Sequence, residues 1–477
     1  MLDELEISGF KRYDEDGATL RLAPITLLLG ANSAGKSSVL QMLLCLAQSW
    51  DRLSGFYRLA PTGRLADLGR FAGVVHKGNG ASASAVRLRL GRVSFVWEDD
   101  EASARDDGEP SSTRHGTLAS MQVRHAPDEA VPVDWHFQAN AGDLPTEVVF
   151  TLERRSIEAW VNVVPESAHL LQPLLRADSP ATISWRMRDD DGLLSPSLHP
   201  LTDAAVRELA NHVGQDEMDP STLWGSCRAA MMYVIGLRRR LRSTAHVGGL
   251  RDRGQRTYVV RDEDRPWRVG PSGSRIADVL LCIGDVLADT NELLRQAKIP
   301  YEIEVRPLGG SADGVEIMLR DLRSGPTAGN VIGLPDAGTG VAQVLPIAVQ
   351  LAVLRDKQET GVQPLLLVEQ PELHLHPKWQ ARLATMFAKV TRPGPDVNPV
   401  QMLIETHSEH LVLGFGHEIY KGRLRPEDVS VLFFEDDAEH GKVQVHPIRF
   451  APDGRFRDRW PEGFFPDRAQ LLRGEMP

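Results

Sequence analysis

The residues best suited to chemistry lie in LLLGANSAGKSSV, at positions 27–39. Gly30, Gly35, Lys36 and Ser37 have the G-x-x-x-x-G-K-[ST] spacing of a P-loop. Glycine permits backbone conformations that a side chain forbids, so the amides of this loop can turn toward a phosphate. A lysine here supplies positive charge to the β- and γ-phosphates, and the serine hydroxyl can bind Mg²⁺. The sequence therefore predicts an ATP and Mg²⁺ site, with a phosphate cradle of Asn32, Ser33, Ala34, Gly35, Lys36, Ser37 and Ser38.

A second motif, PLLLVEQPELHLHP, spans residues 364–377. An apolar strand that ends in an acid is the Walker B pattern, and Glu369 is expected to bind Mg²⁺ directly or through water, opposite the P-loop serine. Many such ATPases have a glutamate at the next position, where this chain has Gln370. Because an amide cannot act as a base near neutral pH, we expect slow hydrolysis. Either Glu372 replaces the missing base, or Gln370 only orients the attacking water.

The third motif, LIETHSEH at residues 403–410, is an apolar strand followed by polar residues. His407 would lie at the edge of the sheet, where an imidazole can hydrogen-bond the γ-phosphate or the attacking water. A lone histidine is more often structural, but the order P-loop, Walker B, histidine favours a functional role.

The fourth motif, DAGTGVAQVLP at residues 336–346, precedes an apolar helix predicted over 347–354. Glycines at a helix start leave backbone amides unpaired at the positive end of the helix dipole, which suits a phosphate. A glycine-rich loop alone is weak evidence, yet its place before Walker B is typical of ATPases that clamp ATP between two subunits. The candidate phosphate contacts are Asp336, Gly338, Thr339 and Gly340.

The elements that must position these motifs follow an α/β pattern. A buried strand at 25–29 leads into a helix at 37–49, and apolar runs after residue 333 alternate with helical segments, which predicts one sheet for the P-loop and the late strands. Six β-like runs between 85 and 164 indicate an antiparallel β lobe, with a mobile acidic loop at 98–114, and 202–242 reads as helical. The expected organisation is an N-terminal part of the ATPase core at 1–84, a β-rich lobe at 85–200, a helical insertion at 201–245 and the C-terminal part of the core at 246–477.

Composition narrows the class of protein. The 477 residues carry a formal net charge of −11, which argues against a surface that tracks nucleic acid throughout, although the basic run LRRRLR at 237–242 leaves a local contact open. A solvated helix face is the simpler interpretation of that run, and Arg251, Arg253 and Arg256 strengthen the alternative. The three cysteines have no C-x-x-C spacing, so neither zinc nor a disulfide framework is expected. With no basic leader and no apolar run of membrane-spanning length, we expect a cytoplasmic protein.

The order GANSAGKSS, DAGTGVAQVLP, LLLVEQPELHLHP, ETHSEH resembles the ABC-type ATPase heads of SMC, RecF and OLD (overcoming lysogenisation defect) proteins. It is most similar to the bacterial OLD-like ATPases of the broader AAA class that have an E-Q-P-E Walker B and a short C-terminal extension. HVGGLRD, QRTYVV and RWPEGFFPDRAQLL also resemble pieces of that group. The resemblance implies a P-loop NTPase fold of the ABC-head type, a mixed sheet flanked by helices, with an antiparallel β lobe and an inserted helical segment.

The resemblance also implies a homodimer or higher oligomer, in which residues 336–340 of one subunit cap the ATP held by Lys36 of another. Lys11 and Arg12 match a region that such heads place near the nucleotide. The signature serine of such heads is missing: Pro335 and Ala342 occupy the candidate positions, which leaves Thr339 as a hydroxyl donor.

Full OLD proteins continue into a Toprim nuclease domain, but this chain has only about seventy residues after His407, too few for that domain. No nuclease activity is therefore expected. The expected function is an ATP-dependent clamp or switch for a separate effector, such as a nuclease, or for DNA, with anti-phage defence as the setting. Alternatives are a DNA-repair ATPase of the SMC/RecF type and a non-hydrolysing scaffold. A transport ATPase is disfavoured because neither LSGGQ nor an early Q-loop is present.

Overall fold

The computed structural model describes residues 2–50, 58–77, 85–99, 116–123, 135–138, 147–152, 181–186, 233, 236–259, 267–308, 314–323, 330–356, 363–391, 399–436 and 442–461. The chain divides into two compact units. We call Leu20–Leu40 with Ser243–Pro477 the core unit, and Leu2–Thr19 with Gln41–Arg242 the β-rich unit. Each is described separately.

The core unit contains a six-stranded sheet with the order β11-β16-β17-β3-β18-β19. The strands are β11 (Ala245–Val247), β16 (Leu365–Glu369), β17 (Gln401–Glu405), β3 (Ile25–Gly30), β18 (Val429–Asp436) and β19 (Val443–Ile448). All neighbours pair in parallel except β19, which runs antiparallel to β18, so the sheet is mixed. Nearly every residue of β3, β16 and β17 is buried, as expected for strands covered on both faces. The prediction that the P-loop strand and the late strands share one sheet is confirmed.

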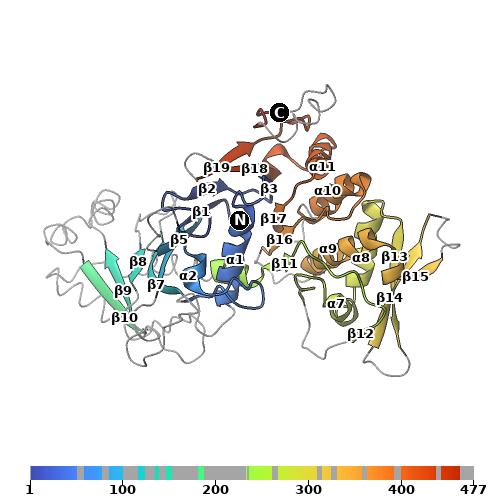
Figure 1. The fold of residues 1–477 in the computed structure, drawn as a ribbon, viewed down its shortest axis with the longest axis horizontal. Coiled ribbons are helices and arrows are strands. Elements are labelled where there is room, and N and C mark those ends of the chain that lie inside the picture. Colours follow the sequence, from blue (N-terminus) through green and yellow to red (C-terminus); the bar gives the residue numbers. More distant parts are fainter. Residues whose placement is uncertain are drawn as a thin grey trace, which may run out of the picture. The chain divides into compact units, whose positions relative to one another are not determined.

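Helices connect these strands along the chain, and three of them come between β11 and β16. They are α1 (Lys36–Trp50), α7 (Ile276–Cys282), α8 (Val286–Gln296), α9 (Thr339–Asp356), α10 (Pro377–Thr391) and α11 (Glu409–Tyr420), with the short 3₁₀ helices η4 (Leu334–Asp336) and η5 (Pro426–Asp428). In Figure 1, α10 and α11 lie side by side, and α8 packs against α9. The α/β fold class, with a mixed sheet flanked by helices, is confirmed.

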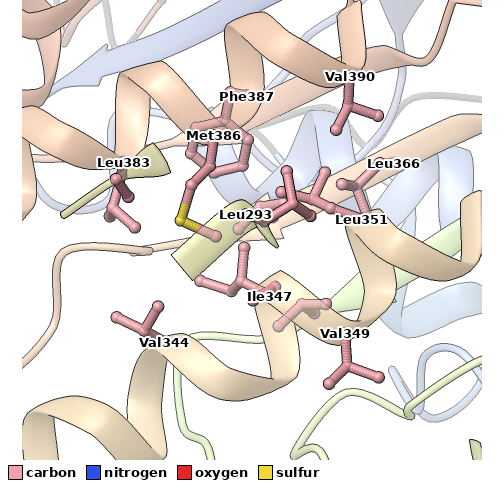
Figure 2. Packing of buried hydrophobic residues seen from close by; sticks show 14 of the residues in the cluster. Leu293, Val344, Ile347, Val349, Leu351, Leu366, Leu383, Met386, Phe387 and Val390 are labelled. Atoms are coloured by element: carbon pink, nitrogen blue, oxygen red, sulfur yellow. The ribbon is translucent and has the colours of Figure 1, made fainter. Parts of the chain in front are cut away.

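One contiguous apolar cluster joins the sheet to helices α7 to α11. Figure 2 shows Leu366 of β16 near Leu351 and Ile347 of α9, with Leu293 of α8 and Phe387 of α10 around them. All five side chains are fully buried. Because burying such a side chain stabilises the fold by about 1.5–3 kcal/mol, this cluster holds the strand ends that carry the motifs in fixed positions.

The start of α9 differs from the prediction. The sequence placed the helix at 347–354, whereas α9 begins at Thr339 and continues through Pro346. A proline inside a helix costs about 3 kcal/mol, because it removes one hydrogen bond and crowds the preceding turn. Here the first two turns bury Val341, Ala342, Val344 and Leu345 almost completely. That apolar burial outweighs the cost of the proline.

A smaller antiparallel sheet in the core unit has the order β12-β14-β13, with β15 also paired to β14. Its strands are β12 (Tyr258–Val259), β13 (Tyr301–Pro307), β14 (Gly314–Asp321) and β15 (Val331–Gly333). Buried and more exposed residues alternate along β14, as expected when only one face of a sheet packs on a core. The strands predicted at 301–306 and 314–319 are confirmed.

The β-rich unit contains an antiparallel sheet with the order β10-β9-β8-β7-β6-β5-β1-β2, and β4 pairs with β7. The elements are β1 (Glu4–Ser8), β2 (Ala18–Arg21), β4 (Arg58–Leu59), α2 (Phe71–Val74), β5 (Ala85–Leu90), β6 (Val93–Asp99), β7 (Gly116–Val123), β8 (Trp135–Gln138), β9 (Glu147–Leu152) and β10 (Ala181–Arg186). Five of the six predicted β runs are therefore strands, and the antiparallel lobe is confirmed.

Three predictions for this unit need comment. The β run predicted at 157–164 lies outside the described residues, as does most of the segment predicted as helical at 202–242. The loop predicted from Glu98 begins too early, because β6 extends to Asp99 and pairs with the start of β7. The rest of that loop lies outside the described residues. Strand β10 has no counterpart in the sequence prediction.

The basic run at 237–242 is not a uniform solvated face. Arg240 is buried, and this burial lowers the pKa of its guanidinium to about 10. Arg239 and Arg242 are exposed, whereas Arg238 is half-buried. A nucleic-acid contact here would therefore use Arg239 and Arg242, and an Arg240 substitution would disturb packing first.

Cys45 is buried and burial raises the pKa of its thiol to about 12, whereas Cys282 is exposed, and both are free thiols. Among the residues that the structure describes, no helix combines the length and apolarity needed to cross a bilayer.

Candidate functional site

The P-loop follows β3 directly and leads into α1. Gly30 ends the strand at φ +130°, and a Cβ at this position would lie 2.0 Å from the carbonyl oxygen of Phe434. Ser33 and Gly35 also have positive φ values of 65° and 96°, and α1 begins at Lys36. These conformations bend the loop back over the start of the helix, whose first amides have no partner within the helix. Only glycine fits at position 30, so the motif spacing has a steric reason.

Lys36 is 3% exposed and lies over its own loop. Its Nζ donates hydrogen bonds to the carbonyl oxygens of Gly30 at 3.0 Å and Ala31 at 2.6 Å. Burial lowers the pKa of this ammonium, while the nearby Glu405 carboxylate acts in the opposite direction. The loop therefore places a partly desolvated positive charge where the phosphates of a nucleotide would be held. Of the other predicted cradle residues, Asn32 and Ser33 are exposed, whereas Ala34, Gly35 and Ser38 are buried.

The predicted metal serine, Ser37, contacts an acid that the sequence analysis did not select. Its Oγ donates to Oε1 of Glu405 at 2.9 Å. Strand β17 lies between β3 and β16, so Glu405 has Leu28 and Glu369 as its two neighbours in register. Burial raises the pKa of Glu405, against the lowering effects of the Ser37 hydrogen bond and the Lys36 charge. The sequence did contain a signal for Glu405: this acid ends an apolar strand, in the same way that Glu369 ends the Walker B strand.

The predicted Walker B acid, Glu369, ends β16 and pairs with a histidine. His246 of β11 donates through Nε2 to Oε1 of Glu369 at 3.0 Å. Burial acts to raise the pKa of Glu369, but the His246 hydrogen bond, the His246 charge and the Arg251 charge together lower it. Glu369 is therefore a carboxylate at neutral pH, held in place from β11.

Arg251 holds the end of β16 and the residue after it through hydrogen bonds to their backbone. Its guanidinium donates to the carbonyl oxygens of Gly248 at 2.7 Å, Glu369 at 3.0 Å and Gln370 at 2.8 Å. It is 6% exposed, and burial lowers its pKa to about 10 against the opposing charges of Glu372 and Glu369. The suggestion that Arg251 belongs to a nucleic-acid surface is therefore wrong.

Gln370 occupies an unusual backbone conformation, with φ +41°. Its backbone N–H donates to the carbonyl oxygen of Glu405 at 2.7 Å, and its backbone carbonyl accepts from Arg251 at 2.8 Å. A non-glycine residue in the left-handed region is uncommon and persists where its surroundings hold it. The two backbone contacts thus fix the orientation of Gln370, the residue that the sequence places at the water-activating position.

Glu372 and His407 meet next to Gln370. Oε1 of Glu372 accepts the backbone amide of His407 at 2.7 Å. Burial raises the pKa of Glu372, although hydrogen bonds from His407 and Thr406 oppose that effect. Burial and the Lys36 charge lower the pKa of His407, so its imidazole is neutral at pH 7. The structure therefore brings Gln370, Glu372 and His407 together at the carboxyl ends of β16 and β17.

The predicted signature segment lies elsewhere in the core unit. Asp336 ends η4, and its carboxylate forms a bidentate ion pair with the exposed Arg256 at 2.9 and 3.0 Å. Gly338 has φ +82°, and Thr339 is the first residue of α9. Gly340 lies against the turn after Walker B, where a Cβ would be 3.4 Å from the carbonyl oxygen of His374.

Arg12 belongs to the β-rich unit, in the turn that follows β1. Its neighbour Lys11 has φ +50° and donates through Nζ to Gln41 of α1 at 2.6 Å. Burial lowers the pKa of Lys11, with Cys45 acting in the opposite direction. This turn is thus a fixed part of its own unit.

Two families match parts of the chain. Residues 285–412 match the family described as AAA ATPase domain, and residues 424–473 match the family described as Protein of unknown function (DUF3696). The first match contains the signature segment, Walker B and His407, while the P-loop lies before it. No curated protein matches the chain.

The chain is also similar to solved SMC head structures. An SmcHead bound to the C-winged helix domain of ScpA has a TM-score of 0.41 at 10% identity, covering 94% of this chain and 97% of that chain. The SMC head domain from Thermotoga maritima has a TM-score of 0.38 at 11% identity, covering 94% and 98%. An Smc head with an extended coiled coil, bound to the C-terminal domain of ScpA derived from Pyrococcus furiosus, has a TM-score of 0.38 at 10% identity, covering 99% and 98%.

The P-loop, the acidic strand ends and the AAA match converge on one sheet. The matched segment supplies β16 and β17, and the N-terminal P-loop strand β3 pairs directly with β17. The segment similar to an AAA ATPase domain therefore shares one sheet with the N-terminal P-loop strand.

Proposed function

We propose that this protein binds ATP with Mg²⁺ at its P-loop and hydrolyses it slowly, as a dimeric ABC-type clamp or switch. The observation that carries the proposal is the convergence of Lys36, Ser37, Glu405 and Glu369 at the carboxyl ends of three adjacent parallel strands. The amides of residues 32–38 and the Lys36 ammonium would hold the phosphates.

The oxygen donors at the strand ends fit Mg²⁺, which prefers hard oxygen ligands and usually needs one or two protein carboxylates beside the phosphates. Ser37 and Glu369 are the residues that the sequence assigns to the metal. When bound, Mg²⁺ neutralises charge on the β- and γ-phosphates. Gln370 would orient water through its amide, with Glu372 as the alternative base, and the neutral His407 can donate to or accept from a γ-phosphate oxygen or the water.

The proposed dimer uses the signature segment. Asp336, Gly338 and Thr339 are exposed, and Thr339 lies at the start of an 18-residue helix. The amides of such a helix start favour an anion. A second copy of the chain could therefore present this segment to the ATP held by Lys36, with Thr339 supplying the hydroxyl in place of the usual signature serine.

The partner side of the proposal rests on the motif resemblance. ATP-dependent closure in the cytoplasm would control a separate effector, such as a nuclease, or hold DNA, and anti-phage defence is the setting we favour. DNA repair is the alternative setting. A closed dimer that turns over slowly suits a switch, because the bound state persists after each binding event.

Light scattering during size-exclusion chromatography tests the clamp. The protein is run without nucleotide, with ATP and Mg²⁺, and with ADP and Mg²⁺. We expect the molar mass to double with ATP and not with ADP, because the signature segment needs a γ-phosphate to bind. A single molar mass under all three conditions contradicts the ATP-driven dimer.

Substitutions at Gln370 and Glu372 test the slow turnover. Gln370→Glu places a carboxylate at a backbone position that is already fixed, so we expect phosphate release to rise at least about tenfold, which is below the roughly 100- to 10,000-fold that general acid–base catalysis usually contributes. Gln296→Glu, which makes the same change at the end of α8 and outside the predicted site, serves as the control and should not change the rate.

Glu372→Gln identifies the base in the natural protein. If Glu372 activates the water, its loss abolishes phosphate release, whereas unchanged release assigns the water to Gln370 alone. If the wild-type protein binds ATP normally but releases no phosphate, the protein is a nucleotide-dependent scaffold and the proposed ATPase activity is wrong.

A further inference from the structure

Glu405 is set apart from the other acids of the site by its contact with the P-loop serine. Oε1 accepts the hydrogen bond from Ser37, and Oε2 is buried with no hydrogen-bond partner among the residues that the structure describes. The residue is 6% exposed. A buried acceptor without a hydrogen-bond partner destabilises the fold. The free-energy cost is larger for a carboxylate oxygen than for a neutral oxygen, because the charged group loses more hydration. The Lys36 charge acts on this carboxylate without hydrogen-bonding Oε2, so a metal ion in direct contact with Oε2 would remove the remaining cost.

The neighbouring acids have other partners. Glu369 accepts from His246, and Oε1 of Glu372 accepts the backbone amide of His407. Oε2 of Glu372, like that of Glu405, is buried with no hydrogen-bond partner among the described residues, but Glu372 does not bond the P-loop serine. Glu369 and Glu405 lie side by side in register on β16 and β17, so two carboxylates stand together at the strand ends. Among the described residues, Glu405 is the acid that hydrogen-bonds the P-loop serine.

The Ser37 contact has a chemical consequence. A hydroxyl that donates its proton to a carboxylate keeps its oxygen lone pairs available, which is the state in which it can bind a metal. A partner that fixes a ligand in this way commonly changes metal affinity by about 10–100-fold. Glu369, turned toward His246, does not act on Ser37 in this way.

We propose that Glu405 is the residue that sets Ser37 for Mg²⁺ and that its free oxygen faces the metal. Glu405 is then a positioning residue for the metal site, and Glu369 is a secondary carboxylate. This inference rests on the proposed function, because it takes the P-loop to hold an Mg²⁺ nucleotide.

Metal affinity is measured separately from turnover to test this role. Mn²⁺ replaces Mg²⁺, and electron paramagnetic resonance follows its binding to the protein at saturating ATP. ATP affinity is also measured calorimetrically in EDTA. The proteins are wild type, Glu405→Gln, Glu369→Gln and Glu427→Gln, the last removing an exposed carboxylate in η5 as the matched control.

We expect Glu405→Gln to weaken Mn²⁺ binding by about 10–100-fold and to leave ATP affinity in EDTA within about twofold of wild type. Glu369→Gln should cause a smaller loss, and Glu427→Gln none. Wild-type Mn²⁺ affinity in Glu405→Gln, or a larger loss in Glu369→Gln, overturns the assignment. If the wild-type protein binds no ATP even in EDTA, the proposed function itself fails, which is a different result.

Two further variants guard against a trivial loss of folding. Melting temperatures without nucleotide are compared for all proteins. Glu405→Asp keeps the charge but shortens the side chain away from Ser37, so it should also lose Mn²⁺ affinity. Ser37→Ala combined with Glu405→Gln should bind Mn²⁺ no worse than the weaker single variant, because the two residues act as one unit. Fully additive losses overturn the coupling.

Discussion

Lys36→Ala is expected to weaken ATP binding at least about 100-fold, equivalent to about 2.7 kcal/mol or more. The ammonium is held over the loop by the carbonyls of Gly30 and Ala31 and is partly desolvated, so its charge acts on the phosphates with little screening. Alanine removes that charge and leaves the amide cradle alone. Isothermal titration calorimetry with ATP and Mg²⁺ measures the loss.

Lys389→Ala removes an exposed lysine of α10 and should bind ATP as wild type does. The shift in melting temperature that ATP causes gives a second readout, and it should disappear only in Lys36→Ala. An ATP affinity within threefold of wild type would show that the phosphates are held elsewhere, and the P-loop assignment would then be wrong.

Arg251→Ala is expected to lower the free energy of unfolding by about 3 kcal/mol or more. The guanidinium makes three hydrogen bonds to backbone carbonyls, and its removal leaves the buried carbonyl of Gly248 and the partly buried carbonyls of Glu369 and Gln370 without this donor. The same change frees Gln370 from its left-handed conformation, so phosphate release should also fall. Urea unfolding followed by circular dichroism measures the stability.

Arg253→Ala, two residues further along and exposed, is the matched control and should change stability by less than about 0.5 kcal/mol. Arg251→Lys keeps the charge but lacks the planar fork, so it should recover only part of the loss. If Arg251→Ala unfolds at the same urea concentration as Arg253→Ala, the guanidinium does not hold the Walker B segment.

The burial of Arg251 also limits which arginines could contact nucleic acid. Two of the arginines that a basic-patch interpretation would use, Arg240 and Arg251, are buried. Exposed charge remains at Arg253 and Arg256, and Arg256 is paired with Asp336. A DNA contact through Arg256 would therefore compete with its ion pair to Asp336. The sequence alone does not reveal this ion pair.

The sequence by itself determined the parts of the site that depend on local chemistry. The P-loop spacing is steric, since Gly30 has no room for a side chain beside Phe434. The apolar runs that end in Glu369 and Glu405 are long enough and bulky enough to be buried parallel strands. Both features are visible within a few residues of sequence, so the P-loop, the buried strands and the α/β class could be predicted.

Only the tertiary structure decided which acids and bases meet. Ser37 and Glu405 are 368 positions apart, and they touch because β17 inserts between β3 and β16. His246 reaches Glu369 because β11 pairs with β16, and no local pattern encodes that pairing. Strand order follows from the sum of many apolar contacts across the whole core, so it cannot be read from the residues of one strand. For the same reason, the burial that extends α9 back to Thr339, despite Pro346, emerges only when the chain is folded.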